Sequence, residues 1–151
     1  MFSQTSEYAL RAMVCLANSE DQQMTTRQIA ERTQVPPNYL SKVLLSLVRA
    51  GLVRSQRGLH GGSLLAREPE NITMLEVINA VEPLHHIHQC PLDLKQHQKK
   101  LCPLHRRLEN AVCMIEEAFG STTLADLLSG DSQIKPLCDV TAGEGAGPPG
   151  S

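Results

Sequence analysis

The first part of the chain alternates between apolar stripes at helical spacing and short polar breaks. Residues 8–16 carry apolar side chains every three to four positions, and Ser6 is placed to cap the first turn of this helix. After a polar connector, Thr25 and Thr26 are favourable caps for a second helix that ends near Thr33. The pattern predicts a core-packing helix followed by a shorter one.

A third helix and a hairpin are predicted next. Proline is tolerated in the first turn of a helix, so Pro37 can open a helix that ends at Gly51. The stretches 52–57 and 63–66 are typical of two short strands joined by a glycine-rich loop. Helix, short helix, turn, helix and hairpin are the parts of a winged helix-turn-helix. We therefore expect a mainly α fold with a two-stranded wing.

The second half of the chain predicts two helices of different character. Thr73 is placed to cap a short apolar helix that ends before Pro83, whereas residues 84–101 show no clear period. From Pro103 a long amphipathic stripe runs to Gly120. A stripe this strong, far from the hairpin in sequence, most often pairs with its copy in a dimer, so we expect a C-terminal dimerisation helix.

Length and composition fit one small unit of this kind. The chain has 151 residues, the size of one ordinary domain, and with two Phe, two Tyr and no Trp its core must be built from aliphatic side chains. We expect four parts: a winged helix-turn-helix DNA-binding domain (1–82), a cysteine- and histidine-containing sensor loop (83–102), a dimerisation helix with a terminal turn (103–130) and a disordered tail (131–151).

The charge differs between the two halves of the chain. The net charge is −2, but residues 1–67 hold eight Lys and Arg against four Asp and Glu, whereas residues 68–151 hold six against twelve. The first half thus has the basic footprint of a phosphate-contacting surface, although ordinary solvated faces show the same excess. Residues 1–18 lack the pattern of a signal peptide, since Glu7 and Arg11 stand among their apolar residues, and no apolar run is long enough to span a bilayer. We therefore expect a cytoplasmic protein with no membrane partner.

The predicted third helix carries polar residues where such a helix contacts DNA. In a helix-turn-helix the second helix lies in the major groove and its first turns reach base edges. Those turns offer Asn38, Ser41 and Lys42, with Tyr39 at the margin of the same face. Lys42 can pair with guanine acceptors and Asn38 can pair with adenine, whereas Arg27 is placed for a phosphate contact. Any one of these residues is more often part of a solvated face, but the set as a whole indicates double-stranded DNA as the partner.

The loop between the two predicted strands adds a second set of DNA-binding candidates. Arg57 and His60 stand among glycines that let the backbone turn tightly beside another surface. Both side chains suit a narrow minor groove. A plain hairpin turn is the alternative, but a basic residue among so many glycines serves no obvious packing need.

These motifs resemble the signature of the bacterial Rrf2 family of transcription regulators. The specific part joins an Ala-Gly-Leu-Val lead-in at residues 50–53 to an Arg-Gly-x-x-Gly-Gly wing at residues 57–62. Similar segments are Glu7–Ala12, Pro37–Leu40 and Thr122–Leu127, so the resemblance covers roughly residues 1–128. One departure is Ser63, where members usually carry an aromatic residue. The resemblance implies a homodimeric repressor or activator, and two-fold symmetry then requires a pseudo-palindromic operator.

Two cysteines and a histidine have a spacing compatible with a ligand set. Cys90, Cys102 and His105 form C-x11-C-x2-H between the fourth and fifth predicted helices. Thiolates and imidazole are ligands of iron–sulfur clusters and of zinc, and Cys102 lies at a helix start, where the helix dipole favours the thiolate. In the cytoplasm the five cysteines are more often reduced thiols or metal ligands than disulfides. A redox thiol pair, a zinc site and no cofactor stay open as alternatives.

The resemblance adds a specific cofactor to this set. Family members that hold an iron–sulfur cluster resemble this chain at Cys90, Cys102 and His105, but they usually carry a third cysteine near Gln96. His97 stands beside that position and is a candidate replacement. Because a 2Fe-2S cluster can be completed with non-cysteine ligands, the missing cysteine favours a 2Fe-2S cluster with mixed ligands over a 4Fe-4S one.

The remaining candidates are weighed against ordinary structural roles. In some relatives an acidic residue of the first helix, matching Glu7, supplies a ligand from the partner subunit, and Cys113 is a further candidate on the long helix. Cys15 lies on an apolar face and is more often a core residue, whereas Cys138 is expected to be an unpaired surface thiol. A solvated loop is favoured for His85, His86 and His88 over a metal site.

Taken together, the sequence predicts a DNA-binding transcription regulator whose operator affinity changes with the cofactor or redox state of the Cys90 and Cys102 site. The signal would be nitric oxide, iron, oxidants or cluster supply. Rival hypotheses are a cofactor-free relative controlled by a protein or small molecule, a thiol or zinc switch, and a redox enzyme. We expect no enzyme, because the sequence lacks a phosphate-cradling loop and a nucleophile–base–acid set.

Overall fold

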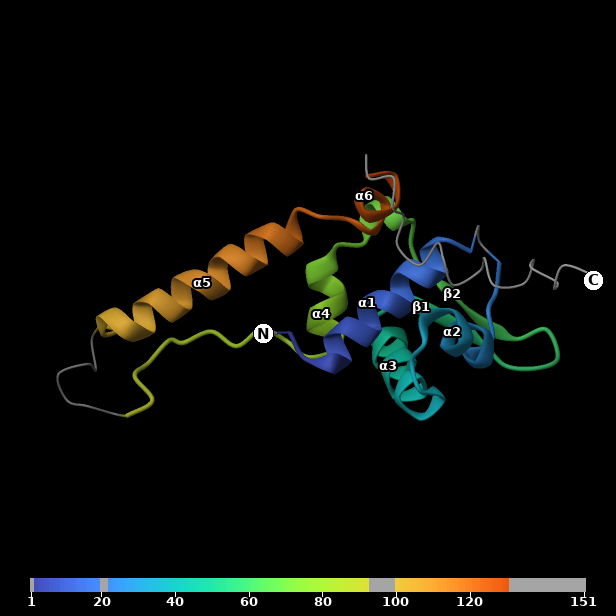
Figure 1. The fold of residues 1–151 in the computed structure, drawn as a ribbon, viewed down its shortest axis with the longest axis horizontal. Coiled ribbons are helices and arrows are strands. Elements are labelled where there is room, and N and C mark those ends of the chain that lie inside the picture. Colours follow the sequence, from blue (N-terminus) through green and yellow to red (C-terminus); the bar gives the residue numbers. More distant parts are fainter. Residues whose placement is uncertain (1, 20–21, 93–99, 131–151) are drawn as a thin grey trace, which may run out of the picture.

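The computed structural model describes residues 2–19, 22–92 and 100–130, and Figure 1 shows a helical body from which one long helix projects. The elements in chain order are α1 (Gln4–Ala17), α2 (Thr26–Thr33), α3 (Pro37–Arg49), β1 (Val53–Gln56), β2 (Gly62–Leu65), the 3-10 turn η1 (Pro69–Asn71), α4 (Met74–Val81), α5 (Pro103–Gly120) and α6 (Leu124–Ser129). This order confirms the predicted mainly α winged helix-turn-helix with a two-stranded wing and a long C-terminal helix. The expected tail lies outside the described residues.

Local capping explains where most helices begin. Thr25 and Thr73 each form a capping box, in which the threonine hydroxyl and a side chain three residues later satisfy the first free backbone N–H groups. Both caps confirm the prediction. The predicted cap at Ser6 is wrong, because α1 begins earlier: the Ser3 hydroxyl accepts from the Ser6 N–H and Ser6 itself is buried in the first turn.

The core of the body forms around α1, which contacts α2, α3, α4 and α6. Ala9, Ala12 and Met13 of α1 are fully buried, and small residues at two of these positions let neighbouring helices approach closely. The other fully or almost fully buried large side chains are Ile29, Leu40, Leu47, Leu52, Val53, Ile72, Val77, Ile78 and Leu124. The core is therefore aliphatic, as the composition predicts.

The wing is anchored to the body by backbone contacts. Strands β1 and β2 pair antiparallel from Val53 opposite Leu65 to Gln56 opposite Gly62. Met24 and Ser63 exchange two backbone hydrogen bonds of 3.0 and 2.7 Å, which add a short bridge beside β2. A side chain at Gly62 would lie 2.8 Å from the Met24 carbonyl oxygen, so this glycine is needed for the wing to meet the body.

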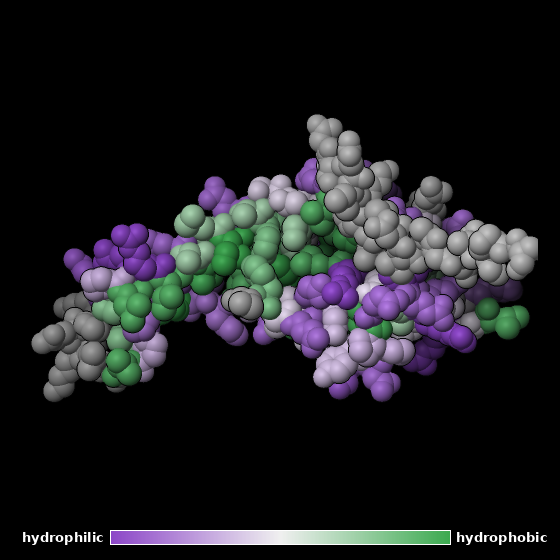
Figure 2. All heavy atoms as spheres, viewed as in Figure 1, coloured by the Kyte–Doolittle hydropathy of each residue, from purple (hydrophilic) through white to green (hydrophobic). Residues whose placement is uncertain are grey.

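Helix α5 forms an arm that is packed very differently from the body. None of its 18 residues is buried, and the segment that follows α4 runs alongside it (Figure 1). After α5 the chain returns to the body, where the Met74 N–H donates to the Thr122 carbonyl and the Leu124 N–H to the Ile72 carbonyl, both at 2.9 Å. Figure 2 shows apolar side chains gathered along the arm. No helix in the described ranges is long and apolar enough to cross a membrane.

Candidate functional site

The first turns of α3 present the predicted DNA-contacting residues on one exposed face. Asn38, Ser41 and Lys42 are exposed, whereas the opposite side of the helix is buried. Tyr39 shares the exposed face with 55% of its surface accessible, and its ring meets Tyr8 edge-on at 6.2 Å between centroids. The geometry suits a helix that inserts into a groove, because the apolar side holds it to the body and the polar side is free.

The wing brings a basic residue to the same region. Arg57 follows β1 and lines one open pocket together with Ser41 of α3; its other lining residues are Thr26, Leu44, Leu45, Val48, Ser55 and Ser63. His60 lies exposed near the tip of the wing loop. The two predicted sets of DNA contacts, helix and wing, therefore lie on neighbouring surfaces.

Arg27 and the wing glycines, both predicted to serve DNA binding, also have roles within the fold. Arg27 lies on α2 with 87% of its side chain accessible, and it pairs with Glu31 at 2.9 Å, one turn further along the helix. Such an exposed pair is weak and leaves the guanidinium able to turn toward a phosphate. The wing glycines serve the fold as well as any ligand: Gly58 has a φ of +115°, and a side chain at Gly61 would collide with the Gln56 carbonyl oxygen.

The cysteine segment brings two of its three predicted ligands together. Cys102 is the N-cap of α5, and its Sγ lies 3.1 Å from Nδ1 of His105 in the first turn. Cys90 is buried, but the ligand atoms of Cys90, Cys102 and His105 do not all lie within 4.8 Å of one another. A thiolate and an imidazole on adjacent turns can bind one metal ion. In a two-iron cluster the protein ligands are divided between the two irons, so Cys90 can belong to the ligand set without lying beside Cys102 and His105. His97 falls outside the described residues.

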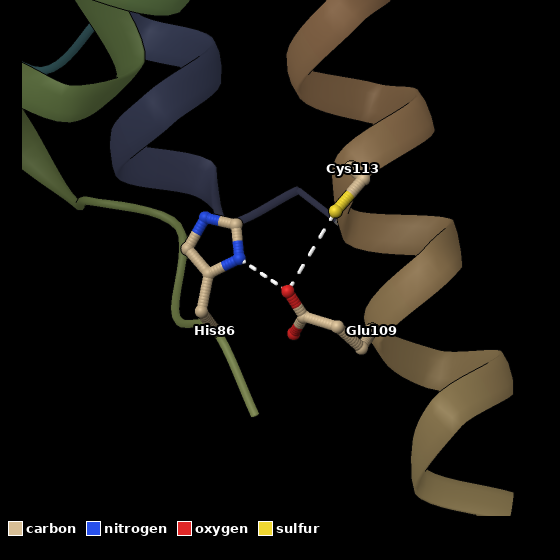
Figure 3. Close-up of side chains that lie close together, drawn as sticks. All are labelled: His86, Glu109 and Cys113. Carbon is tan, nitrogen blue, oxygen red and sulfur yellow. Dashed lines mark hydrogen bonds and ion pairs between the residues drawn. The ribbon is translucent and has the colours of Figure 1, made fainter. Parts of the chain in front are cut away.

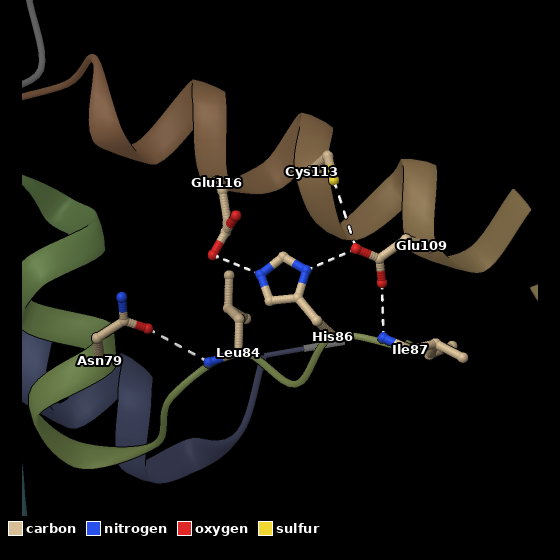
Figure 4. Close-up of polar contacts among 7 residues, drawn as sticks. All are labelled: Asn79, Leu84, His86, Ile87, Glu109, Cys113 and Glu116. Atoms are coloured by element: carbon tan, nitrogen blue, oxygen red, sulfur yellow. Dashed lines mark hydrogen bonds and ion pairs between the residues drawn. The ribbon is translucent and has the colours of Figure 1, made fainter. Parts of the chain in front are cut away.

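A polar cluster joins the segment after α4 to α5 (Figures 3 and 4). His86 Nδ1 lies 2.6 Å from Glu109 Oε1, and His86 Nε2 lies 3.0 Å from Glu116 Oε1. The Ile87 N–H donates to the other Glu109 oxygen at 2.6 Å, and the Cys113 thiol donates to Glu109 at 3.6 Å. The expectation of a solvated loop is wrong for His86, because two carboxylates of α5 hold both of its ring nitrogens.

The charges of this cluster reinforce one another. The hydrogen bonds to Glu109 and then Glu116 raise the pKa of His86, and the same bond to His86, followed by the Ile87 N–H, lowers the pKa of Glu109. Desolvation and the hydrogen bond to Glu109 raise the pKa of the Cys113 thiol. The cluster is thus a proton-bridged contact between the loop and the arm.

Comparison with known proteins places the chain in a family. The Rrf2 profile, described as an iron-dependent transcriptional regulator, matches residues 2–130. The chain belongs to the Rrf2 family. It is 28% identical over 135 residues to the HTH-type transcriptional regulator NsrR of Bacillus licheniformis, covering 87% of this chain and 94% of that protein.

Two solved structures share the fold of this chain. The chain resembles IscR of T. potens with 31% identity and a TM-score of 0.70 over 85% of each chain. It also resembles CymR, the global cysteine regulator of B. subtilis, with 29% identity and a TM-score of 0.69, covering 84% of this chain and 95% of that one. This protein is accordingly a winged helix-turn-helix transcription regulator of the Rrf2 family, and its relatives imply DNA binding.

The two remaining ligand candidates, Glu7 and Cys113, lie in different places in the fold. Glu7 lies on α1 in an ion pair of 2.7 Å with Arg11, which also donates to the Thr33 carbonyl at 3.1 Å. Cys113 lies on α5 beside Glu109 rather than in a group with Cys102. Cys15 is a core residue as predicted, since it is 3% exposed and its burial raises the pKa of the thiol.

Sequence reasoning did not single out Glu109 and Glu116 as functional candidates. A signal was present: Glu109, Cys113 and Glu116 are spaced by four and three residues, so they share one face of a helix. Their partner His86 stands 23 residues before Glu109 in a segment without periodicity. A pairing across such a segment is set by tertiary structure, which the pattern of α5 alone does not contain.

Proposed function

We propose that this Rrf2 protein is a homodimer that binds a pseudo-palindromic operator and acts in the cytoplasm as a regulator, not an enzyme. Asn38 and Lys42 contact base edges, Ser41 and Tyr39 border them, and the remaining contacts to the DNA backbone and minor groove come from Arg27, Arg57 and His60. Supporting this proposal, the α3 residues share one exposed face, and Arg57 lines a pocket with one of them.

We further propose that the operator affinity is set by an iron–sulfur cluster, 2Fe-2S in type, held at the N-terminal end of α5. Cys102 and His105 supply a thiolate and an imidazole, Cys90 supplies a second thiolate, and Glu7 of α1 reaches the cluster from the partner subunit. The single observation that carries the sensor proposal is the 3.1 Å contact between Cys102 and His105 at the start of α5. The family description as iron-dependent supports the choice of metal.

The location of these residues suggests how sensing changes DNA affinity. The cluster supplies iron that can be oxidised, nitrosylated or lost. Cys102 and His105 lie at the far end of a helix with an exposed face that carries apolar side chains: Leu104 is 64% and Met114 70% exposed. If that face pairs two subunits, a change at Cys102 alters the angle between two winged domains, and operators with fixed half-site spacing respond to that angle.

Anaerobic reconstitution tests the sensor proposal. Wild-type protein is expected to be brown, with charge-transfer absorption and two irons per subunit, whereas Cys90→Ala and Cys102→Ala each lose the iron. Cys15→Ala is the matched control, because that buried thiol lies in the core and should not affect iron content. Full iron occupancy in the Cys90 and Cys102 variants would overturn the proposal.

A zinc or thiol switch is the second candidate for the same residues. The zinc switch is favoured by one observation, the 3.1 Å contact between Cys102 Sγ and His105 Nδ1, because a thiolate and an imidazole are zinc ligands. Metal analysis of the same anaerobic sample separates the two candidates: stoichiometric zinc without charge-transfer bands supports a zinc switch, and metal-free protein with a reversible Cys90–Cys102 oxidation supports a thiol switch.

A further inference from the structure

We propose that His86, Glu109 and Cys113 form a second metal site, for a divalent transition-metal ion of the zinc type, between the segment after α4 and the face of α5 that it covers. The site is separate from the cysteine segment that precedes α5 and does not depend on the cluster proposed there. It would fasten the loop to the arm at a point where protein contacts are otherwise polar.

The placement of the three donors is set by helix geometry and by the loop. Glu109 and Cys113 are one turn apart on α5, so their side chains extend from the same face, and His86 reaches them from the opposite side. One ligand atom from each residue lies within 4.8 Å of the other two. A tetrahedral zinc ion with bonds of about 2.0–2.3 Å separates its ligands by roughly 3.5 Å, so small shifts suffice.

The donor chemistry is that of zinc and its neighbours in the first transition series. One imidazole, one carboxylate and one thiolate give mixed N, O and S ligation, which suits borderline ions and disfavours calcium and magnesium. His86 and Glu109 are partly buried, whereas Cys113 is exposed, so the ion would have an entry path and a fourth position open to water.

The groups around the three donors are already arranged to orient them. Only one nitrogen of His86 can bind the ion, and Nδ1 faces Glu109; Nε2 faces Glu116 and can donate its proton there at 3.0 Å. The Ile87 N–H occupies the second oxygen of Glu109 and leaves Oε1 directed at His86. A carboxylate behind the histidine and a hydrogen bond behind the ligating carboxylate are the usual supports of a zinc ligand set.

Without metal, a proton bridges His86 and Glu109 and another resides on the Cys113 sulfur. The ion takes the place of these protons: the Nδ1 proton and the thiol proton leave to solvent, and bonds from the ion to Nδ1, Oε1 and Sγ form. No electron transfer is involved. The contact between the loop and α5 therefore exists in two forms, one bridged by a proton and one by the metal ion, and both use the same side chains.

Cobalt(II) titration of the full-length chain tests the site, with cobalt as a spectroscopic substitute for zinc. The background is a Cys90→Ser/Cys102→Ser double variant, so that the proposed cluster residues add no thiolate signal. We expect one equivalent of cobalt with a thiolate-to-cobalt charge-transfer band, displaced by zinc. In this background Cys113→Ser should abolish the band, and His86→Gln should weaken binding at least about tenfold.

Matched variants keep the result interpretable. His85→Gln changes an exposed histidine of the same loop and should bind like the background. Glu116→Ala should weaken binding by about 10–100-fold while keeping the band, because it removes the support of His86 and no ligand. If His86→Gln perturbs folding by circular dichroism, Glu109→Gln removes the carboxylate but retains an oxygen for the Ile87 N–H. Absence of the band, or equal affinity in the His85 and Glu109 variants, overturns the site.

Discussion

The body and the α5 arm are held together by different forces. In the body, α1 to α4 and α6 all contribute buried side chains, and Leu40, Leu47 and Ile29 are completely inaccessible. In the arm, an 18-residue helix has no buried residue, and its closest ties to the preceding loop are the hydrogen bonds of His86 and Ile87. The body can therefore fold as a unit, whereas the arm needs a partner surface or a bound group to gain comparable stability.

Helix α5 carries both polar side chains that contact the loop and apolar side chains that are exposed. Glu109, Cys113 and Glu116 face the loop of the same subunit. Leu104 and Leu108 of the same helix are both exposed. Exposed apolar side chains on a helix with no buried residue are typical of a surface that pairs with a partner.

The strongest test of the comparison replaces one leucine in each region. Leu47→Ala removes a fully buried side chain of the body and should lower the free energy of unfolding by about 2–5 kcal/mol. Leu104→Ala removes a mostly exposed side chain of the arm. This variant should lower the free energy of unfolding of the subunit itself by well under about 1 kcal/mol. Urea unfolding over a range of protein concentrations measures both, since a contribution from a dimer depends on concentration and one from the core does not. Equal losses would show that the arm is packed like the body.

Association of the arm is tested by placing a charge on its apolar face. Leu108→Glu should convert the dimer to a monomer at micromolar concentration, because a carboxylate would be buried without a partner. Asn110→Glu adds the same side chain to an exposed position of the same helix and should leave the dimer intact. Sedimentation velocity distinguishes the species. A dimeric Leu108→Glu variant would mean that another surface holds the subunits together.

DNA affinity should depend on basic residues of the body and not on those of the arm. Lys42→Ala is expected to cost about 1–3 kcal/mol of operator binding and to relax preference at one base pair. Arg57→Ala should weaken binding to all sequences and reduce the salt dependence by about one unit of slope. Arg106→Ala removes the same charge from α5 and serves as control. Binding titrations at several salt concentrations measure these effects; operator binding by Lys42→Ala and Arg57→Ala equal to wild type would refute the assigned surface.

The body was also the region that sequence could predict. Its elements follow from local signals: apolar periodicity in α1 and α3, threonine caps before α2 and α4, and glycines at the wing. The one wrong cap, Ser6 in place of Ser3, arose because Ser6 is itself buried and the polar residues before it still belong to the helix.

The arm could be predicted as a helix, but its contacts could not. The period of α5 identifies its faces, and its start at Pro103 follows from proline at the first helical position. The partner of its polar face lies in a loop, and loops are placed by tertiary contacts that leave no repeat in the sequence. The interpretation of His86 as solvated failed for this reason, although the matching face of Glu109 and Glu116 was visible.

The smallest expected effect compares the acid response of the two regions through Glu76 and Glu117. Although partial burial opposes ionisation, hydrogen bonds from Thr73 and Arg67 lower the pKa of Glu76 below its ordinary value of 4.5. A lowered pKa means that the folded state binds this proton less readily than the unfolded state, so the stabilisation is present above about pH 4.5 and is lost as the pH falls through the folded-state value.

Glu76→Gln keeps an oxygen for the Thr73 N–H but removes the charge opposite Arg67, whose guanidinium lies 2.8 Å from Glu76. Because both side chains are substantially exposed, the variant should lose less than about 1 kcal/mol at neutral pH, and this difference should shrink as the pH falls below 4.5. Glu117→Gln, at an exposed position of α5, is the control and should track wild type throughout. Urea unfolding between pH 3 and 7 provides the measurement. A Glu76→Gln deficit that persists unchanged at low pH would assign the effect to the geometry of the cap, since only the charge contribution disappears on protonation.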